Sequence, residues 1–240
     1  MIDARDLQGG IVRGYGTRFA FARHLFARVR EPAPARLFLA AIAGPVTTEE
    51  EWAQRPATTL NVALSFRALE ALEVPPAILD GFPPAFRCGM AHRADRLGDD
   101  PRSWDDELRD LEVLLVVHAQ SAEALAEEAE GWERALDRGD HGLELAHAQD
   151  AALLGKQREH FGFTDGFSQP AIEGVAAREG MRMTPWFEEK LRLWPFAASD
   201  GKTENGLKLS RNSALPVCTS SAAHPAVVVV APATAARVTR

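Results

Sequence analysis

The amino-acid sequence predicts an α+β fold close to the ferredoxin-like, split βαβ arrangement, with helices on one face of a single sheet. Three observations predict it. Beyond residues 1–30, four segments of strand character alternate with three segments of helical character. The clearest helical period, in residues 121–142, falls between the last two strands. Hydrophobic residues make up 46% of the 240 residues, which is enough to form a sizeable core.

The N-terminal part of the chain predicts one helix outside the sheet and then the first strand–helix pair. Residues 17–30, TRFAFARHLFARVR, carry apolar side chains at mostly helical spacing, which predicts a helix. Residues 35–44, ARLFLAAIAG, form a nearly continuous apolar run before a proline, so we expect a buried strand. The acidic segment that follows, with Thr47 or Thr48 as N-cap, predicts a helix.

The remaining elements alternate regularly. Alternating or continuous apolar patterns indicate the strands, and a helical period with a serine cap or a proline stop indicates the helices. In chain order we expect a strand at 58–66, a helix at 65–74, a loop, short helix and loop at 79–104, a strand at 110–120, a helix at 121–142 capped by Ser121, and a strand at 143–154.

Composition and charge exclude several classes of partner. The net charge of −7 argues against a nucleic-acid surface, which requires clustered Lys and Arg. There is no apolar run of about 18 residues and the start does not resemble a secretory signal, so we expect no membrane association. Cys88 and Cys218 are far apart and suit free thiols in the cytoplasm, with a disulfide between them as the alternative.

The most distinctive segment is HFGFTDGFSQPAIEG, residues 160–174. It follows neither a helical nor a strand period, and its three glycines indicate that something approaches the backbone closely. At its centre, Asp165 is followed by Gly166. Two interpretations are open for this aspartate: a functional carboxylate presented by the loop, or a surface turn in which it bonds its own backbone.

The pattern GxxDG in residues 162–166 resembles the motif of the dye-decolourising peroxidases. Four further segments resemble that family in the same order: DLQGGIVRGYG at 6–16, LNVALSFRALEALEVP at 60–75, FRCGMAHRADRLGD at 86–99 and VLLVVHAQ at 113–120. The matches run from about residue 5 to about residue 176. Because they are ordered along the chain, they favour the functional interpretation of the loop.

The resemblance implies two ferredoxin-like halves of the dimeric α/β-barrel type, with haem b (heme b, iron protoporphyrin IX) in the second half. It implies reduction of hydrogen peroxide, oxidation of a bulky aromatic or dye-like reductant, and assembly into a homo-oligomer. Asp165 takes the position of the distal acid–base residue, and Gly166 and Phe167 that of the loop against the haem face. A carboxylate is ionised at neutral pH, so it can accept a proton from bound peroxide and return it.

The resemblance also implies a proximal histidine as iron ligand and a distal arginine, and no residue is assigned to either role. His224 is the only histidine beyond the motif segment, and it stands alone before a proline. Residues 206–240 contain no Asp or Glu and predict a disordered tail, with a strand at 226–231 as the alternative.

We interpret the sequence as a truncated or frame-shifted member of the family, altered after about residue 195, and we expect this form to hold haem poorly or not at all. The expected parts are the first ferredoxin-like domain, the start of the haem-binding half and an atypical tail, at residues 1–155, 156–205 and 206–240. Two other functions fit the same residues: a non-catalytic module that binds partners or holds a tetrapyrrole without turnover, and a plain structural domain. The aromatic residues Tyr15, Trp104, Trp186 and Trp194 can carry electrons at the surface or simply pack.

Overall fold

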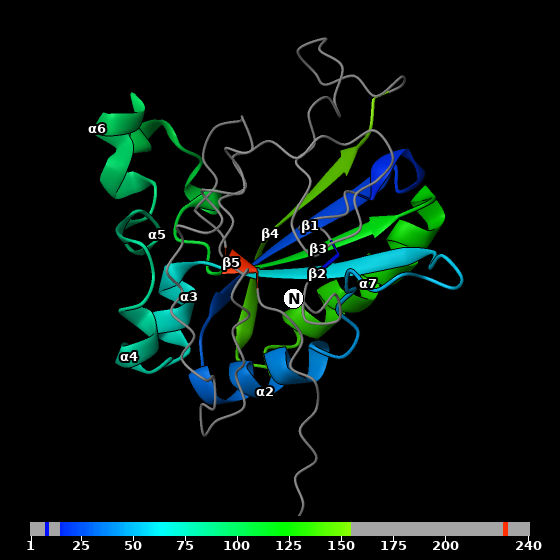
Figure 1. Ribbon diagram of the computed structural model, residues 1–240, viewed down its shortest axis with the longest axis horizontal. Helices are drawn as coiled ribbons and strands as arrows, with labels where there is room; N and C mark the ends of the chain where they lie inside the picture. The colour runs from blue at the N-terminus through cyan, green and yellow to red at the C-terminus, as the bar shows by residue number, and fades with distance from the viewer. Residues whose placement is uncertain (1–7, 10–14, 155–227, 230–240) are drawn as a thin grey trace, which may run out of the picture.

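The computed structural model describes residues 8–9, 15–154 and 228–229. In these ranges five strands form one sheet in the order β4-β1-β3-β2-β5, and every neighbouring pair is antiparallel (Figure 1). The strands are β1 (Phe21–Val29), β2 (Thr58–Leu64), β3 (Val113–Ala119), β4 (Leu143–Ala152) and β5 (Val228–Val229).

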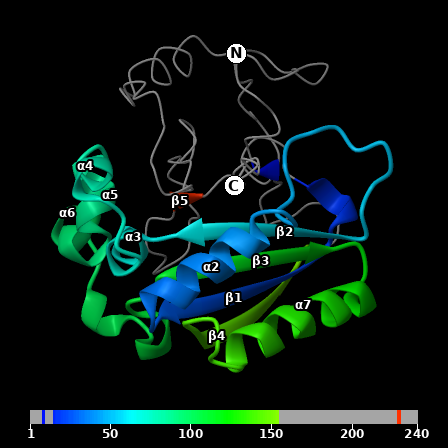
Figure 2. The same ribbon diagram turned by 90° about the horizontal axis from the view of Figure 1, so that it is seen from below.

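The four long strands have the connections of a ferredoxin-like fold. Helix α2 (Pro32–Ile42) lies between β1 and β2 in the chain, and helix α7 (Ala122–Asp137) lies between β3 and β4. Figure 2 shows both helices on the same face of the sheet. The strand order β4-β1-β3-β2, with two crossover helices on one face, confirms the predicted fold class.

An apolar core fills the space between the sheet and these two helices. The buried residues of the helices are Ala35, Phe38, Ile42, Leu125, Ala129 and Leu136. The strands contribute alternate residues on the helix side, among which Leu25, Leu115 and Val117 are fully buried. Full burial of such a side chain stabilises the fold by about 1.5–3 kcal/mol, so this core determines which face of each strand meets the helices.

The helix predicted at 17–30 is wrong, because these residues form a 3₁₀ turn, η2 (Gly16–Arg18), and then strand β1. β1 lies inside the sheet, between β4 and β3. A β-bulge between Phe26 and Ala27 shifts the register of β1 against β4. Leu25, Phe26 and Ala27 are all buried, and this continuous run hides the strand alternation from the sequence.

The strand predicted at 35–44 is also wrong, because most of this segment belongs to helix α2. Two prolines stand in the first turn of α2, where their missing N–H groups cost nothing. The buried residues Ala35, Phe38 and Ile42 follow helical spacing, whereas Leu37 is 74% exposed. This exposed leucine occupies a helix position that is usually polar. The segment therefore reads in the sequence as a continuous apolar run, which is typical of a buried strand.

The helix predicted to start at Thr47 or Thr48 is wrong too, since the structure has no helix between α2 and β2. Thr47 pairs with the outer edge of β2 instead. Its N–H donates to the Leu60 carbonyl at 2.8 Å, and its Oγ1 accepts from the Leu60 N–H at 3.1 Å. This pairing ties Thr47 to the sheet edge. The acidic residues that follow therefore do not form the first turn of a helix.

The other predicted elements are confirmed. Strands β2, β3 and β4 lie within the predicted ranges. Ser65 caps α3 (Phe66–Ala71) and Ser121 caps α7, each by accepting a hydrogen bond from the N–H three residues ahead. Among the described residues, none of the helices is long and apolar enough to cross a bilayer.

The segment 79–104 is more helical than predicted. It and its flanks contain α4 (Pro76–Leu79), α5 (Pro84–Cys88), η3 (Ala91–Arg93), α6 (Ala94–Leu97), η4 (Pro101–Ser103) and η5 (Asp106–Leu108). These short helices gather at one end of the sheet, beside α3 (Figure 1). At the outer edge of β2, strand β5 pairs with Ala63 and Leu64, so the strand alternative for the segment 226–231 is confirmed at Val228–Val229.

Candidate functional site

The residues predicted to act on a haem lie outside the described part of the chain. They are Asp165, Gly166, Phe167 and His224, and the same holds for Cys218, Trp186 and Trp194. Their predicted roles remain predictions. Cys88 is described, and it is a free, exposed thiol.

Three of the five described histidines pack against aromatic side chains of this domain. His118 meets the Tyr15 ring edge-on at 5.0 Å, His141 stacks on Phe38 at 4.7 Å and His147 lies 6.1 Å from the Phe26 ring, all between centroids. Each imidazole therefore packs against an aromatic side chain of this domain. Within the described residues there is also no group of three His, Cys, Asp or Glu side chains that could hold a metal ion. No step of a reaction can be derived through a haem in this part of the chain.

The first of the family-like segments, residues 6–16, secures the outer edge of β2 through Gln8. The Gln8 side chain pairs with both backbone groups of Val62: Nε2 donates to the carbonyl at 2.8 Å, and Oε1 accepts from the N–H at 2.9 Å. Gln8 is fully buried. A glutamine amide thus takes the place of a neighbouring strand at an edge that would otherwise present unpaired groups.

Gly9 and Tyr15 fix the same segment to the sheet. The Tyr15 hydroxyl donates to Asn61 Oδ1 at 2.7 Å. A β-carbon on Gly9 would lie 2.9 Å from both the Thr48 carbonyl oxygen and the Tyr15 hydroxyl oxygen, so the close packing requires glycine. Within the segment that resembles the family's opening turn, the described residues Gln8, Gly9 and Tyr15 therefore anchor the sheet edge.

An aromatic cluster covers part of the sheet face opposite the helices. Tyr15 stacks on Trp52 at 6.1 Å between centroids and contacts His118 from the other side. His118 Nδ1 and Oγ1 of its cross-strand neighbour Thr59 are buried, and neither has a hydrogen-bond partner among the described residues. Burial, with a smaller contribution from the nearby His24, lowers the pKa of His118 from 6.5 to about 4.

Two adjoining pockets at the end of the sheet form what we call the basic cleft. The larger, of about 600 Å³, lies between α3, α5, η3 and the η4–η5 loop. The smaller, of about 470 Å³, adds the C-terminal end of β1. The pockets share Arg67, Arg109 and Asp110, and four arginines line each of them.

Aromatic side chains form one wall of the larger pocket. Phe66 and Phe86 meet edge to face at 5.8 Å and 89°. The Arg87 guanidinium carbon lies 5.8 Å from the Phe66 ring centroid, a cation–π contact. Trp104 also lines the pocket, and its indole N–H donates to Asp99 Oδ2 at 3.0 Å, which fixes the ring orientation.

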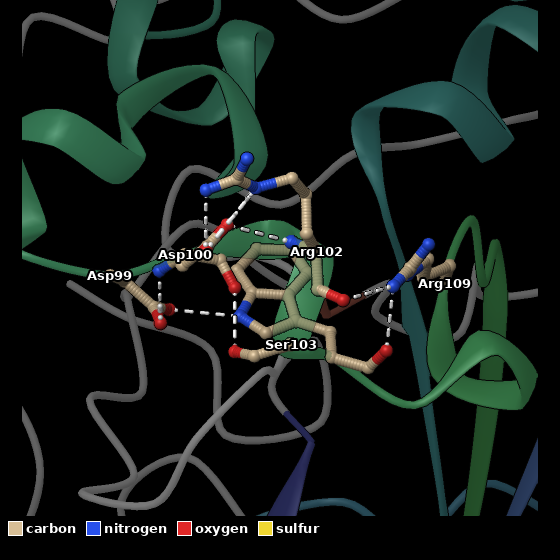
Figure 3. Close-up of polar contacts among 6 residues, drawn as sticks. Asp99, Asp100, Arg102, Ser103 and Arg109 are labelled. Carbon is tan, nitrogen blue, oxygen red and sulfur yellow. Dashed lines mark hydrogen bonds and ion pairs between the residues drawn. The ribbon is translucent and has the colours of Figure 1, made fainter.

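Arg109 holds the η4–η5 loop in place. Its Nη2 donates to the carbonyl oxygens of Trp104 at 2.8 Å and Arg102 at 3.1 Å (Figure 3). Its Nη1 pairs with Asp106 at 2.9 Å. Its Nε is buried and has no acceptor among the described residues. Arg102 in turn forms a fork with the Asp100 carboxylate, with Nε and Nη2 each 2.9 Å from an oxygen (Figure 3).

The basic cleft is not apparent from the sequence. Its arginines come from β1, α3, α5 and the loop before β3, so no short segment contains more than two of them. The available signal was weak: pairs such as Arg28 and Arg30 stand two residues apart, which in a strand places them on one face.

Comparison with known proteins relates the chain to peroxidases. No protein-family model matches it. A dye-decolorizing peroxidase from Mycena epipterygia is 32% identical over 124 residues, which are 50% of this chain and 23% of that protein. A decolorizing peroxidase from Auricularia auricula-judae has the same fold with a TM-score of 0.65 and 23% identity, covering 76% of this chain and 42% of the other. For an ancestral D-type dye decolorizing peroxidase the TM-score is 0.61 at 23% identity, covering 72% and 40%.

These comparisons confirm the resemblance to dye-decolourising peroxidases over part of the chain. The solved structures, at 23% identity, show the fold of the part of this chain that they match. The chain spans 42% of the Auricularia structure, and its match covers 23% of the Mycena protein. The activity of the whole relatives is therefore a basis for a proposal about this chain.

Proposed function

We propose that this chain is part of a haem-dependent peroxidase of the dye-decolourising type, which reduces hydrogen peroxide and oxidises bulky aromatic donors. One observation carries the proposal. The sequence matches follow the family's order up to the GFTDG segment at 162–166, and the part before that segment has the ferredoxin-like fold of the solved peroxidases. Neither a lone motif nor a common fold would be sufficient, because each occurs without this function.

In this proposal Asp165 is the acid–base group. Its carboxylate accepts a proton from hydrogen peroxide and returns it to the departing water, which requires a carboxylate about 3 Å from the reacting oxygen or one water away. The haem would supply the iron that exchanges electrons with peroxide. Gly166 and Phe167 lie next to Asp165 in sequence, and a glycine there lets the backbone approach a flat ring.

The described domain supports this site from the first half. β4 is paired with β1 from Leu143 to Ala152, and the Leu153 N–H donates to the Ala20 carbonyl at 2.8 Å. The polypeptide thus leaves the edge strand β4, which is anchored along β1, shortly before the motif segment begins. We assign the haem-binding part to residues 156–205, with 206–240 as a tail.

A hemin titration of the full chain tests the proposal against its alternatives. A Soret band that saturates at one hemin per chain and changes when hydrogen peroxide is added would support a competent peroxidase. Saturation without a response to peroxide would favour the non-catalytic module that holds a tetrapyrrole. If no specific hemin complex forms, this chain acts as neither, and the plain structural domain remains.

Peroxide-dependent oxidation of an anthraquinone dye provides the second readout for the same samples. Turnover that rises with the hemin-bound fraction supports a peroxidase, because free hemin gives a rate proportional to total hemin instead. A rate that tracks total hemin alone would contradict the proposal even where a complex forms.

A further inference from the structure

We propose that the basic cleft binds a small planar aromatic carboxylate. The cleft belongs to the described first half of the chain, and ligand binding there requires no haem. This proposal is therefore independent of the proposed peroxidase function. It is argued from the charge, the aromatic wall and the rigidity of the cleft.

The charge of the larger pocket favours an anion. The chain as a whole carries −7, yet four arginines and one aspartate line this pocket. Asp80 and Asp100, which pair with Arg87 and Arg102, lie outside the lining. These ion pairs are solvent-exposed, and exposed pairs contribute at most about 1 kcal/mol, so a ligand carboxylate can replace one at little cost.

The smaller pocket limits the charge of that anion. It has four arginines, but three carboxylates, Asp106, Asp110 and Glu112, stand among them. The phosphates of a phosphate-rich ligand or a nucleic acid would be repelled by these carboxylates, because the two pockets adjoin at Arg67 and Arg109. A ligand with a single carboxylate avoids this repulsion, so the cleft favours a monoanion.

The wall of the larger pocket favours an aromatic ring beside the carboxylate. Phe66, Phe86 and Trp104 line the pocket, and the 5.8 Å between the Phe66 and Phe86 ring centroids is typical of aromatic packing. Guanidinium groups stack on planar ligands as well as pairing with carboxylates. The volume of about 600 Å³ is within the range of small-molecule sites. A two-ring acid therefore fits both the size and the lining.

The cleft is held open before a ligand arrives. Arg109 ties the η4–η5 loop through two carbonyl oxygens, and the Trp104 indole is fixed by Asp99. Ordered side chains lose little further entropy on binding, which favours affinity at a shallow site. Arg67 is the group left to recognise the ligand, since it lines both pockets, its side chain is 60% exposed and its ion-pair partner is Asp110.

Isothermal titration calorimetry of the full chain with 2-naphthoate tests this inference. The uncharged 2-naphthalenemethanol has the same rings and serves as the matched ligand. We expect naphthoate to bind at least tenfold more tightly than the alcohol at about 0.02 M salt, and this preference to shrink at about 0.5 M salt, where surface charges are screened.

Two variants identify the site. Arg67→Gln should weaken naphthoate binding about tenfold, the usual effect of losing one charge-assisted hydrogen bond, while binding of the alcohol is unchanged. Arg134→Gln is the matched control, because Arg134 is 65% exposed, has a similar surface ion pair with Glu130 and lies on α7 away from the cleft. Circular dichroism checks that the fold is kept.

If Arg67→Gln disturbs the fold, Arg87→Gln provides a second test, because Arg87 lines the larger pocket but not the smaller one. Equal affinity for naphthoate and the alcohol would overturn the proposal. So would an equal affinity of the wild type and both cleft variants for naphthoate.

Discussion

At the scale of single residues, His118 and Gln8 show how this domain treats buried polar groups. Gln8 is fully satisfied: its side-chain amide replaces a strand at the edge of β2. His118 is the opposite case, because its Nδ1 is buried without an acceptor or donor in the described part of the chain. A buried imidazole without a partner favours the neutral form, which makes the domain sensitive to acid.

His118 should make the fold less stable in mild acid. Its pKa is 6.5 when unfolded and about 4 when folded, so the unfolded chain takes up a proton first as the pH falls. The stability is complete above about pH 6.5 and is lost between 6.5 and 4, by at most about 3 kcal/mol. Urea unfolding at several pH values measures this.

His118→Phe is the variant that isolates the effect. A phenyl ring keeps the contact with Tyr15 and has no proton to gain. The difference in unfolding free energy between wild type and variant should therefore grow in favour of the variant as the pH falls. A difference that stays constant from pH 7 to pH 4 would show that His118 does not titrate in this range.

At the scale of elements, sequence and structure agree best on the later strands and on the long helix α7, whereas the N-cap predicted at Thr47 or Thr48 is wrong. Ser121 caps α7 as predicted, because a serine before a helical period has a local mechanism, and Ser65 caps α3 in the same way. The errors fall on β1 and α2, whose apolar patterns are ambiguous. β1 is a central strand with a bulge, and α2 carries an exposed leucine, so each shows the other's pattern. Tertiary packing, which no local window contains, decides between them.

The turn between α7 and β4 offers a prediction about glycine. Gly142 has φ of +68°, and a β-carbon there would lie 2.3 Å from the Glu31 carbonyl oxygen and 2.8 Å from the Ala35 nitrogen. Gly142 also accepts hydrogen bonds from the Arg30 and Glu31 N–H groups, which join this turn to the start of α2. Gly142→Ala should destabilise the domain by more than about 2 kcal/mol, through both strain and a backbone clash.

Gly131→Ala is the matched control for this change. Gly131 lies inside α7, and a β-carbon there has nothing within 4 Å. Alanine is the better helix former by up to about 1 kcal/mol, so this variant should be as stable as the wild type or more stable. Thermal unfolding followed by circular dichroism compares the three proteins. If Gly142→Ala melted with the wild type, the packing of the turn would be wrong.

At the scale of the whole molecule, the described residues form one ferredoxin-like unit, and the match of the chain covers 42% of a decolorizing peroxidase structure. The sequence predicted this class although three early elements were wrong. The helix predicted at 17–30 is strand β1, the strand predicted at 35–44 is helix α2 and the helix predicted from Thr47 or Thr48 is absent, so a strand, a helix and a strand still follow one another. The basic cleft could not be predicted in the same way. Its walls come from segments that the fold brings together, and each arginine alone has the pattern of an ordinary surface residue.

The central claim about the whole molecule concerns one carboxylate in the second half. If Asp165 moves the proton of hydrogen peroxide, the asparagine variant keeps the size of the side chain and loses the base. General acid–base groups of this kind contribute on the order of 10²–10⁴ in rate. Asp95→Asn, at an exposed position on α6, makes the same chemical change away from the motif.

Stopped-flow spectroscopy of the hemin-loaded chain with hydrogen peroxide is the most direct measurement. Only samples with matched Soret bands are compared, so that haem content does not enter the rate. The account predicts that Asp165→Asn slows the reaction with peroxide by about 10²-fold or more, whereas Asp95→Asn stays within about twofold of the wild type. An Asp165→Asn protein that reacts with peroxide as fast as the wild type would contradict the acid–base role.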